Sequence, residues 1–208
     1  MPFVQRGHTR KGLPMSTIIT TQTVKASLRR GGVAGMVAET VMAMFAMVAS
    51  VTYQHHGFFT PLLHISALIG SLDPMMRSVS EAMTGNRLWF TAGPAALGLL
   101  IHMMTGAMFG IGFVFLARRI RRTALVPAGG VYGLAVFVVS AFIGLPLAAK
   151  ITNSGTAISH MTSMVGWATF AVEHLIFGVV LGILAVRTAP TESALGTVYD
   201  PRSAMLSR

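Results

Sequence analysis

Residues 102–110 read HMMTGAMFG and residues 174–182 read HLIFGVVLG, so the pattern H-x-x-x-G-x-x-x-G occurs twice in the chain. Both copies lie inside long apolar segments. A spacing of four residues places the histidine and both glycines on one face of a helix. Small residues at this spacing let two helices approach closely in a lipid bilayer. The two motifs therefore predict close helix packing, with one histidine buried in each copy.

The composition favours a membrane protein over a soluble one. Of the 208 residues, 53% are hydrophobic and only 11% are charged, whereas soluble domains carry about 25% charged residues. The mean hydropathy of +0.67 agrees with a lipid bilayer as the surroundings of the chain. There is no cysteine, which excludes disulfides, thiolate metal ligands and cysteine nucleophiles.

Four segments are apolar and long enough to provide the ~20 residues that a membrane-crossing helix needs. They fall at residues 33–53, 93–117, 126–149 and 164–186. Helices are expected, because an open strand would leave its backbone unsatisfied in lipid. The first helix is expected to be retained rather than cleaved as a signal peptide, because its apolar core is long. The predicted fold class is an all-α membrane protein with four transmembrane helices.

The connection at residues 54–92 is too long for a simple turn. Thr-Pro opens a predicted short helix at 60–72, and Asp-Pro at 73–74 opens a second one with Asp as the N-cap. Gly-Asn at 85–86 ends this second helix. We expect one or two short interfacial helices that lie along the outer face or cap the bundle.

The chain ends are polar, without strong helical periodicity. Residues 1–28 are basic, and residues 188–208 hold scattered Pro, Gly, Ser and Thr. Both are predicted to be disordered tails. They flank a predicted transmembrane domain of residues 29–187.

The net charge of +10 is explained by membrane topology. The basic residues stand at the ends of apolar segments, and no basic-aromatic surface is visible, so nucleic acid is not an expected partner. The excess of Lys and Arg before the first span, between the second and third spans and after the fourth predicts that both termini are cytoplasmic. The residues that create this excess are Arg29, Arg30, Arg118, Arg119, Arg121, Arg122 and Arg187.

The first and third spans also share a pattern. Residues 31–35 read GGVAG and residues 129–133 read GGVYG, and each block precedes an H-x-x-x-G-x-x-x-G helix. The arrangement predicts two parallel helix-pair repeats, the first carrying the outer insertion. Convergent packing needs are the alternative to duplication. The predicted packing residues are Gly31, Gly32, Gly35, Gly106, Gly110, Gly129, Gly130, Gly133, Gly178 and Gly182.

Four ionisable residues fall inside predicted spans, where their burial is costly and marks a functional candidate. They are Glu39, His102, Glu173 and His174. The last three are expected at similar depth near the midplane, and Glu39 nearer the cytoplasm. A histidine beside a buried carboxylate offsets the cost of desolvation, so these groups are candidates for a proton relay.

Three functions are compatible with these residues. The preferred prediction is a packing or accessory subunit, in a homo-oligomer or with another membrane protein. The first alternative is a small proton- or ion-coupled transporter. The second is a copper- or haem-binding protein, with His102 and His174 as axial ligands or with an outer set of imidazole ligands. The outer candidates are His55, His56, His64 and His160.

No catalytic residue is predicted, because no nucleophile elbow, phosphate loop or zinc-protease motif is present, and an enzyme is not expected. The sequence requires no cofactor.

Residues 173–182, EHLIFGVVLG, look like the last-helix pattern of small bacterial inner-membrane proteins of the YagU-like type. Residues 32–35, GVAG, are similar to the opening of their first helix. The resemblance covers short pieces of three helices. It implies a bacterial cytoplasmic membrane location, and it implies no established biochemical activity and no catalytic or binding residues.

Overall fold

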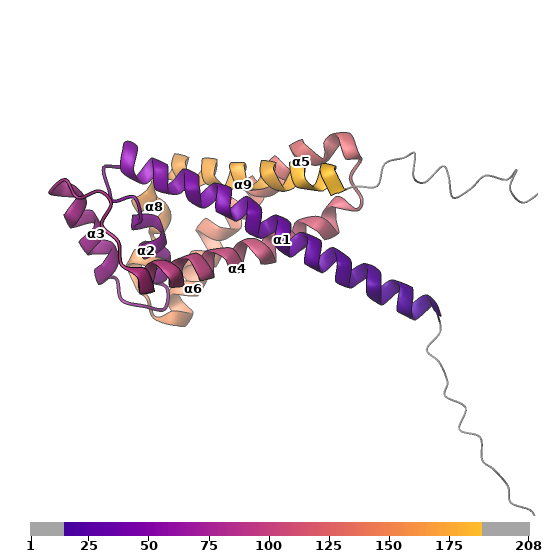
Figure 1. The fold of residues 1–208 in the computed structure, drawn as a ribbon, viewed down its shortest axis with the longest axis horizontal. Coiled ribbons are helices and arrows are strands. Elements are labelled where there is room, and N and C mark those ends of the chain that lie inside the picture. Colours follow the sequence, from indigo (N-terminus) through magenta and orange to yellow (C-terminus); the bar gives the residue numbers. More distant parts are fainter. Residues whose placement is uncertain (1–14, 189–208) are drawn as a thin grey trace, which may run out of the picture.

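The computed structural model describes residues 15–188, which are helical with no strand among them (Figure 1). Four segments are long and apolar enough to cross a membrane: Val24–Thr52, Ala92–Ala117, Arg122–Thr152 and Trp167–Arg187. The predicted all-α fold with four transmembrane helices is confirmed. The outer parts of the predicted tails, residues 1–14 and 189–208, lie outside the described residues.

The first helix, α1 (Met15–Thr52), begins well before the predicted span. Residues 15–28 were expected in a disordered tail, and that expectation is wrong for this stretch. The reason is local: no glycine or proline occurs between residues 15 and 30. Once the apolar span has nucleated a helix, adding residues to its end costs little, so the helix continues past the hydrophobic segment.

The third span is not one regular helix. It consists of a short 3-10 turn η1 (Arg122–Ala124), helix α5 (Leu125–Val139), a π-helical turn η2 (Ser140–Gly144) and helix α6 (Leu145–Thr152). Pro146 has no N–H to donate to the preceding turn, and its ring clashes with the carbonyl four residues earlier. The backbone widens into a π turn just before this proline, an irregularity that is frequent at functional sites.

The second and fourth spans are α4 (Ala92–Ala117) and α9 (Trp167–Thr188). α9 begins three residues after the predicted start at 164. Gly166 has a φ of +93°, which separates α9 from a short preceding helix. This conformation is open to glycine and strained for other residues.

The connections after the first and third spans contain four short helices: α2 (Thr60–Ser66), α3 (Asp73–Met83), α7 (Thr156–Ser159) and α8 (Met161–Val165). The predicted helix at 60–72 is too long, because α2 ends at Ser66. The Ser66 carbonyl accepts the last hydrogen bond of this segment, from the Gly70 amide. Asp73 is the first residue of α3 rather than its cap; the Ser71 hydroxyl accepts the Asp73 amide instead, at 3.1 Å.

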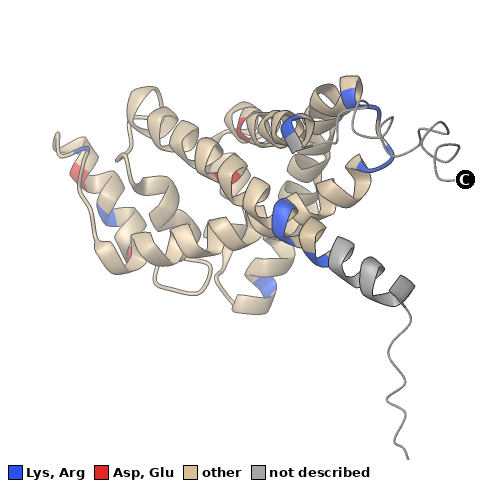
Figure 2. Cartoon of the chain, turned by 45° about the vertical axis from the view of Figure 1, so that its right-hand side comes forward, with Lys and Arg blue, Asp and Glu red and all other residues tan. Residues whose placement is uncertain are grey.

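The long helices pack as two pairs, α1 with α4 and α5 with α9, and α1 also packs on α9 (Figure 1). The core between them is built from Ala38, Met42, Phe113, Phe177 and Leu181. Most Lys and Arg of the described part of the chain lie at the end of the bundle where η1 and the end of α9 are found (Figure 2). The opposite end carries the short helices.

Many large apolar side chains of the spans point outward. Leu100, Met104, Val131, Phe142 and Ile183 are all exposed. Such a surface is stable in lipid and unfavourable in water. Together with the four spans, it defines an α-helical multi-pass membrane protein.

Candidate functional site

Two glycine seams hold the helix pairs together. In the α1–α4 seam, a Cβ added to Gly35 would overlap the carbonyl oxygen of Gly106, and one added to Gly110 would overlap that of Gly31. Here only glycine allows the two backbones to touch. The predicted packing residues of the first helix pair are thus brought together.

The α5–α9 seam has the same construction. A Cβ added to Gly133 would overlap the His174 carbonyl oxygen, and a Cβ added to Gly178 would overlap the Gly129 carbonyl oxygen. A Cβ on Gly182 would lie 2.6 Å from the Leu125 carbonyl oxygen.

Gly32 and Gly130 were predicted to pack but differ from the other glycines. A Cβ there would meet only side chains, at 3.9 Å and 3.4 Å respectively.

A buried ion pair stands at the end of the α1–α4 seam. Glu39 Oε1 lies 2.9 Å from His102 Nδ1, and their side chains are 6% and 11% exposed. Gly106 makes room for this carboxylate, since a Cβ there would lie 2.6 Å from the Glu39 Cβ. The glycine one turn after His102 therefore serves the polar pair as well as the helix contact.

In the α5–α9 seam, the position that corresponds to Glu39 holds an aromatic residue. Phe137 follows Gly133 by four residues, as Glu39 follows Gly35. The Phe137 ring packs edge-on to the His174 ring with 6.1 Å between centroids. The two seams thus share their glycines, but only the first has a carboxylate opposite its histidine.

His174 is held by its own helix. Its Nδ1 donates to the Phe170 carbonyl oxygen at 2.7 Å. A carbonyl only accepts, so the proton is on Nδ1, and Nε2 is left as an acceptor in the neutral ring. The Phe170 ring covers the imidazole, with 4.4 Å between centroids.

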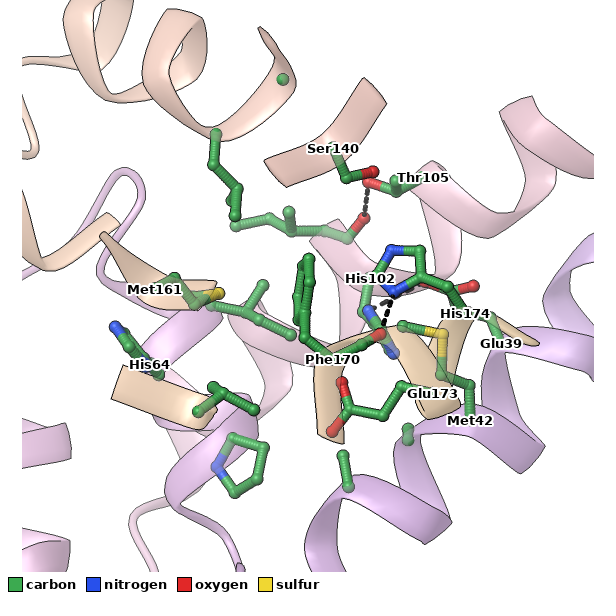
Figure 3. A pocket seen from close by; sticks show the side chains of 18 of the residues that line it. Glu39, Met42, His64, His102, Thr105, Ser140, Met161, Phe170, Glu173 and His174 are labelled. Carbon is green, nitrogen blue, oxygen red and sulfur yellow. Dashed lines mark hydrogen bonds and ion pairs between the residues drawn. The ribbon is translucent and has the colours of Figure 1, made fainter. Parts of the chain in front are cut away.

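Of the four intramembrane ionisable residues, Glu173 is the one without a partner in the described part of the chain. Its residue surface is 5% exposed, and across residues 24–187 its carboxyl group forms no hydrogen bond or ion pair. A buried charge with no partner is unstable in a low-dielectric interior, so such a group holds a proton or awaits a cation. Its carboxyl group borders a partly open cavity between the helices (Figure 3).

This cavity has a volume of about 370 Å³. It lies between α1, α4, the η2 turn and α9, and the short helices α2, α7 and α8 close one end of it. All four ionisable residues that the sequence placed in the membrane line it, and Figure 3 shows them around one space. Most of the remaining wall is apolar and includes Met42, Ile101, Phe109, Met161 and Phe170.

His64 on α2 also lines the cavity, which the sequence did not predict. Its Nε2 donates to the Ala157 carbonyl oxygen at 2.9 Å. Burial lowers the pKa of His64; the hydrogen bond to Ala157 partly opposes this effect, and nearby His56 adds to it. Gly98 on α4 allows this placement of α2, because a Cβ there would overlap the Leu62 carbonyl oxygen and push α2 away from the bundle. This glycine was the signal in the sequence that could have indicated the contact.

The other proposed metal ligands, His55, His56 and His160, do not form a cluster that could bind a metal ion. His55 and His160 are exposed, and His56 is half-buried with a pKa lowered first by burial and then by His55. Within residues 15–188, no three His, Cys, Asp or Glu side chains come together in a way that could hold a metal ion. This arrangement gives the copper prediction no support.

No family model, curated protein or solved structure matches the chain. The YagU-like resemblance therefore stays a prediction, and the geometry of the cavity carries the functional argument.

Proposed function

We propose that the protein is a small proton-coupled transporter with its substrate site in the intramembrane cavity. The observation that carries this proposal is one cavity of about 370 Å³ bordered by Glu39, His102, Glu173 and His174. Protein interiors are close-packed, with few voids larger than a water molecule. A subunit that used these residues only for packing would have no need of such a space.

The coupling proton belongs on Glu173. Two ionised carboxylates that share a low-dielectric cavity repel each other, so one of them favours its protonated form. Glu39 has a histidine partner at 2.9 Å, and Glu173 has none in the described part of the chain. Glu173 is therefore the group that gains and loses a proton during the transport cycle.

The glycine seams support a single-chain function over the accessory-subunit prediction. The paired glycines contact each other within the chain, so they do not supply a face for another subunit. Their matching arrangement in α1–α4 and α5–α9 supports an origin by duplication of a helix pair. The charge distribution and the YagU-like resemblance together favour the bacterial cytoplasmic membrane, with both termini inside.

Transport is tested in proteoliposomes that are acidic inside and loaded with a pH-sensitive dye. Potassium and valinomycin clamp the membrane potential at zero. Three solutes of similar shape are added separately: tetraphenylphosphonium, tetraphenylborate and neutral triphenylphosphine oxide. We expect at least one of them to drive proton efflux above that of protein-free liposomes.

The variant Glu173→Gln removes the titrating oxygen, and we expect it to abolish the response. Glu81→Gln is the matched control, because Glu81 is on α3 and pairs with exposed Arg77 at 3.6 Å, away from the cavity. Identical traces for wild type, Glu173→Gln and empty liposomes with every solute would overturn the proposal.

A further inference from the structure

The geometry points to a lipid-soluble organic cation as the substrate, which enters the cavity from the bilayer between α4 and the η2 turn and exchanges with a proton on Glu173. The inference rests on the proposed transport function and names its substrate class. Three observations carry it: the charge balance of the cavity, the chemistry of its wall and the place where the wall is open.

The charge balance calls for one positive charge. Glu39 on α1 and His102 on α4 lie 2.9 Å apart, and one proton held between the two side chains leaves the pair with no net charge. His174 on α9 and His64 on α2 each donate one N–H to a backbone carbonyl, and neither is paired with a carboxylate among the described residues. The third span contributes only neutral groups to the wall. Among the described residues that line the cavity, only Glu173 carries a charge that no neighbour compensates.

A proton or a monovalent cation neutralises Glu173 equally well. An anion would add to the negative charge, and a neutral solute would leave the carboxylate unpaired in an apolar site. The cavity therefore discriminates in favour of cations by charge alone.

The wall suits a cation that carries apolar groups. Phe170 and Phe109 line the cavity, and aromatic faces attract cations. Met42, Met108 and Met161 supply flexible, polarisable surface that adapts to ligand shape. A small hydrated metal ion would find few oxygen ligands here, whereas an alkyl or aryl ammonium or phosphonium ion would contact the whole wall. The volume of about 370 Å³ lies within the ~300–1,000 Å³ typical of small-molecule sites.

The cavity opens toward lipid between α4 and η2. Met108 and Gly144 both line it and are both exposed, Met108 at 60%. Their neighbours Met104 and Phe142 are exposed and apolar, so this opening faces the hydrocarbon core. Closer to the cytoplasmic end, Tyr132 joins α4 to the third span by donating to the Phe109 carbonyl at 2.8 Å. A ligand that dissolves in the membrane can therefore reach Glu173 from the side.

The exchange balances in charge and atoms. Protonated Glu173 releases its proton to the aqueous phase as the cation binds, and the carboxylate that forms pairs with the cation. No covalent bond to the ligand is made or broken. The cavity is electrically neutral in both states, which removes the cost of an unpaired buried charge from the cycle.

The test uses the purified full chain in detergent with tetraphenylphosphonium as the probe. Binding is followed by calorimetry, and proton release by a pH dye in weak buffer. We expect about one proton to be released per cation bound. In the pH range where Glu173 is protonated before binding, the affinity should increase by up to about tenfold for each unit that the pH is raised. Glu173→Gln should lose proton release and at least ten-fold in affinity, whereas Glu81→Gln should match the wild type.

A second variant tests the route. A Cβ on Gly144 would have only the Val139 carbonyl oxygen nearby, at 3.6 Å, so the backbone leaves room for a side chain to start here, and Gly144→Leu is the variant used. Its side chain would obstruct the opening, and we expect association and dissociation to slow several-fold. An unchanged rate of association in Gly144→Leu would overturn the lateral route. This test does not depend on Glu173→Gln, so it can be made even if that variant is too unstable to purify.

The other outcomes separate the two proposals. If tetraphenylborate or triphenylphosphine oxide drives Glu173-dependent proton flux and the phosphonium does not, transport stands and the cation inference fails. Phosphonium binding without proton release overturns the exchange. A phospholipid or a second copy of the chain that occupies the opening in native mass spectrometry, and that the phosphonium does not displace, also overturns it.

Discussion

Glu39 on α1 and His102 on α4 form a buried pair, with Glu39 Oε1 2.9 Å from His102 Nδ1. At the corresponding place in the α5–α9 seam, Phe137 packs against His174 instead. Two helix pairs with the same glycine contacts thus present different chemistry to one cavity. The paired carboxylate is satisfied within the protein, and the carboxylate beside the second histidine, Glu173, is available for exchange.

The Glu39–His102 pair predicts a large cost when one partner is removed alone. His102→Ala leaves a buried carboxylate without its partner, and we expect a loss of about 3–5 kcal/mol in unfolding free energy. The double variant Glu39→Gln/His102→Gln should lose much less, because two neutral side chains replace the pair. Thermal unfolding in detergent measures both, and equal losses in the single and double variants would contradict the pairing.

The glycine seams predict that two glycines in one helix respond differently to alanine. Gly35→Ala places a Cβ against the Gly106 backbone, which cannot move without separating α1 from α4, so we expect a destabilisation of about 1–3 kcal/mol. Gly32→Ala meets only the Ile111 side chain at 3.9 Å and should be neutral or slightly stabilising, since alanine favours helix. Unfolding midpoints of the two variants, measured side by side, should differ clearly. Similar midpoints would argue against the close approach of the two backbones.

The His64 side chain predicts a loss of stability in acid. Its pKa is lowered below the ordinary value of 6.5 in the folded protein, chiefly by burial. The unfolded chain then takes up a proton at a higher pH than the folded chain does. Above pH 6.5 the residue contributes no pH dependence, and stability falls as the pH drops through and below that value.

His64→Gln is the variant that isolates this effect. Its amide can still donate to the Ala157 carbonyl, but it does not titrate. Subtracting its stability–pH curve from that of the wild type removes the contribution of other groups, including the neighbouring His56. A difference curve that stays flat below pH 6.5 would show that burial of His64 does not govern this range.

The η2 turn predicts that a change which raises the stability of the third span weakens ligand binding. Pro146→Ala restores the missing N–H, and we expect α5 and α6 to merge toward one regular helix with a higher unfolding midpoint. The same change would shift Ser140 and Gly144, which line the cavity, so binding of tetraphenylphosphonium should weaken. Calorimetry and thermal unfolding on the same preparation check both parts. A variant with both higher stability and undiminished binding would separate the π turn from the site.

The sequence predicted much of the membrane-embedded fold. Hydropathy located the four spans, because about 20 consecutive apolar residues have few other stable placements. Four-residue glycine spacing identified the packing faces, since that spacing keeps residues on one side of a helix. The start of α1 was not predicted, because hydropathy locates only the apolar part of a helix. The helix itself continues beyond that part until glycine, proline or a cap ends it.

The sequence by itself determined which residues would be costly to bury: Glu39, His102, Glu173 and His174. Helical periodicity gives the direction of each side chain about its own axis, but it does not tell which helix stands opposite. Only the tertiary structure paired Glu39 with His102, left Glu173 without a partner within residues 24–187 and folded α2 back so that His64 reaches the same cavity. These outcomes depend on contacts between residues far apart in the chain, and close packing in three dimensions is what selects them.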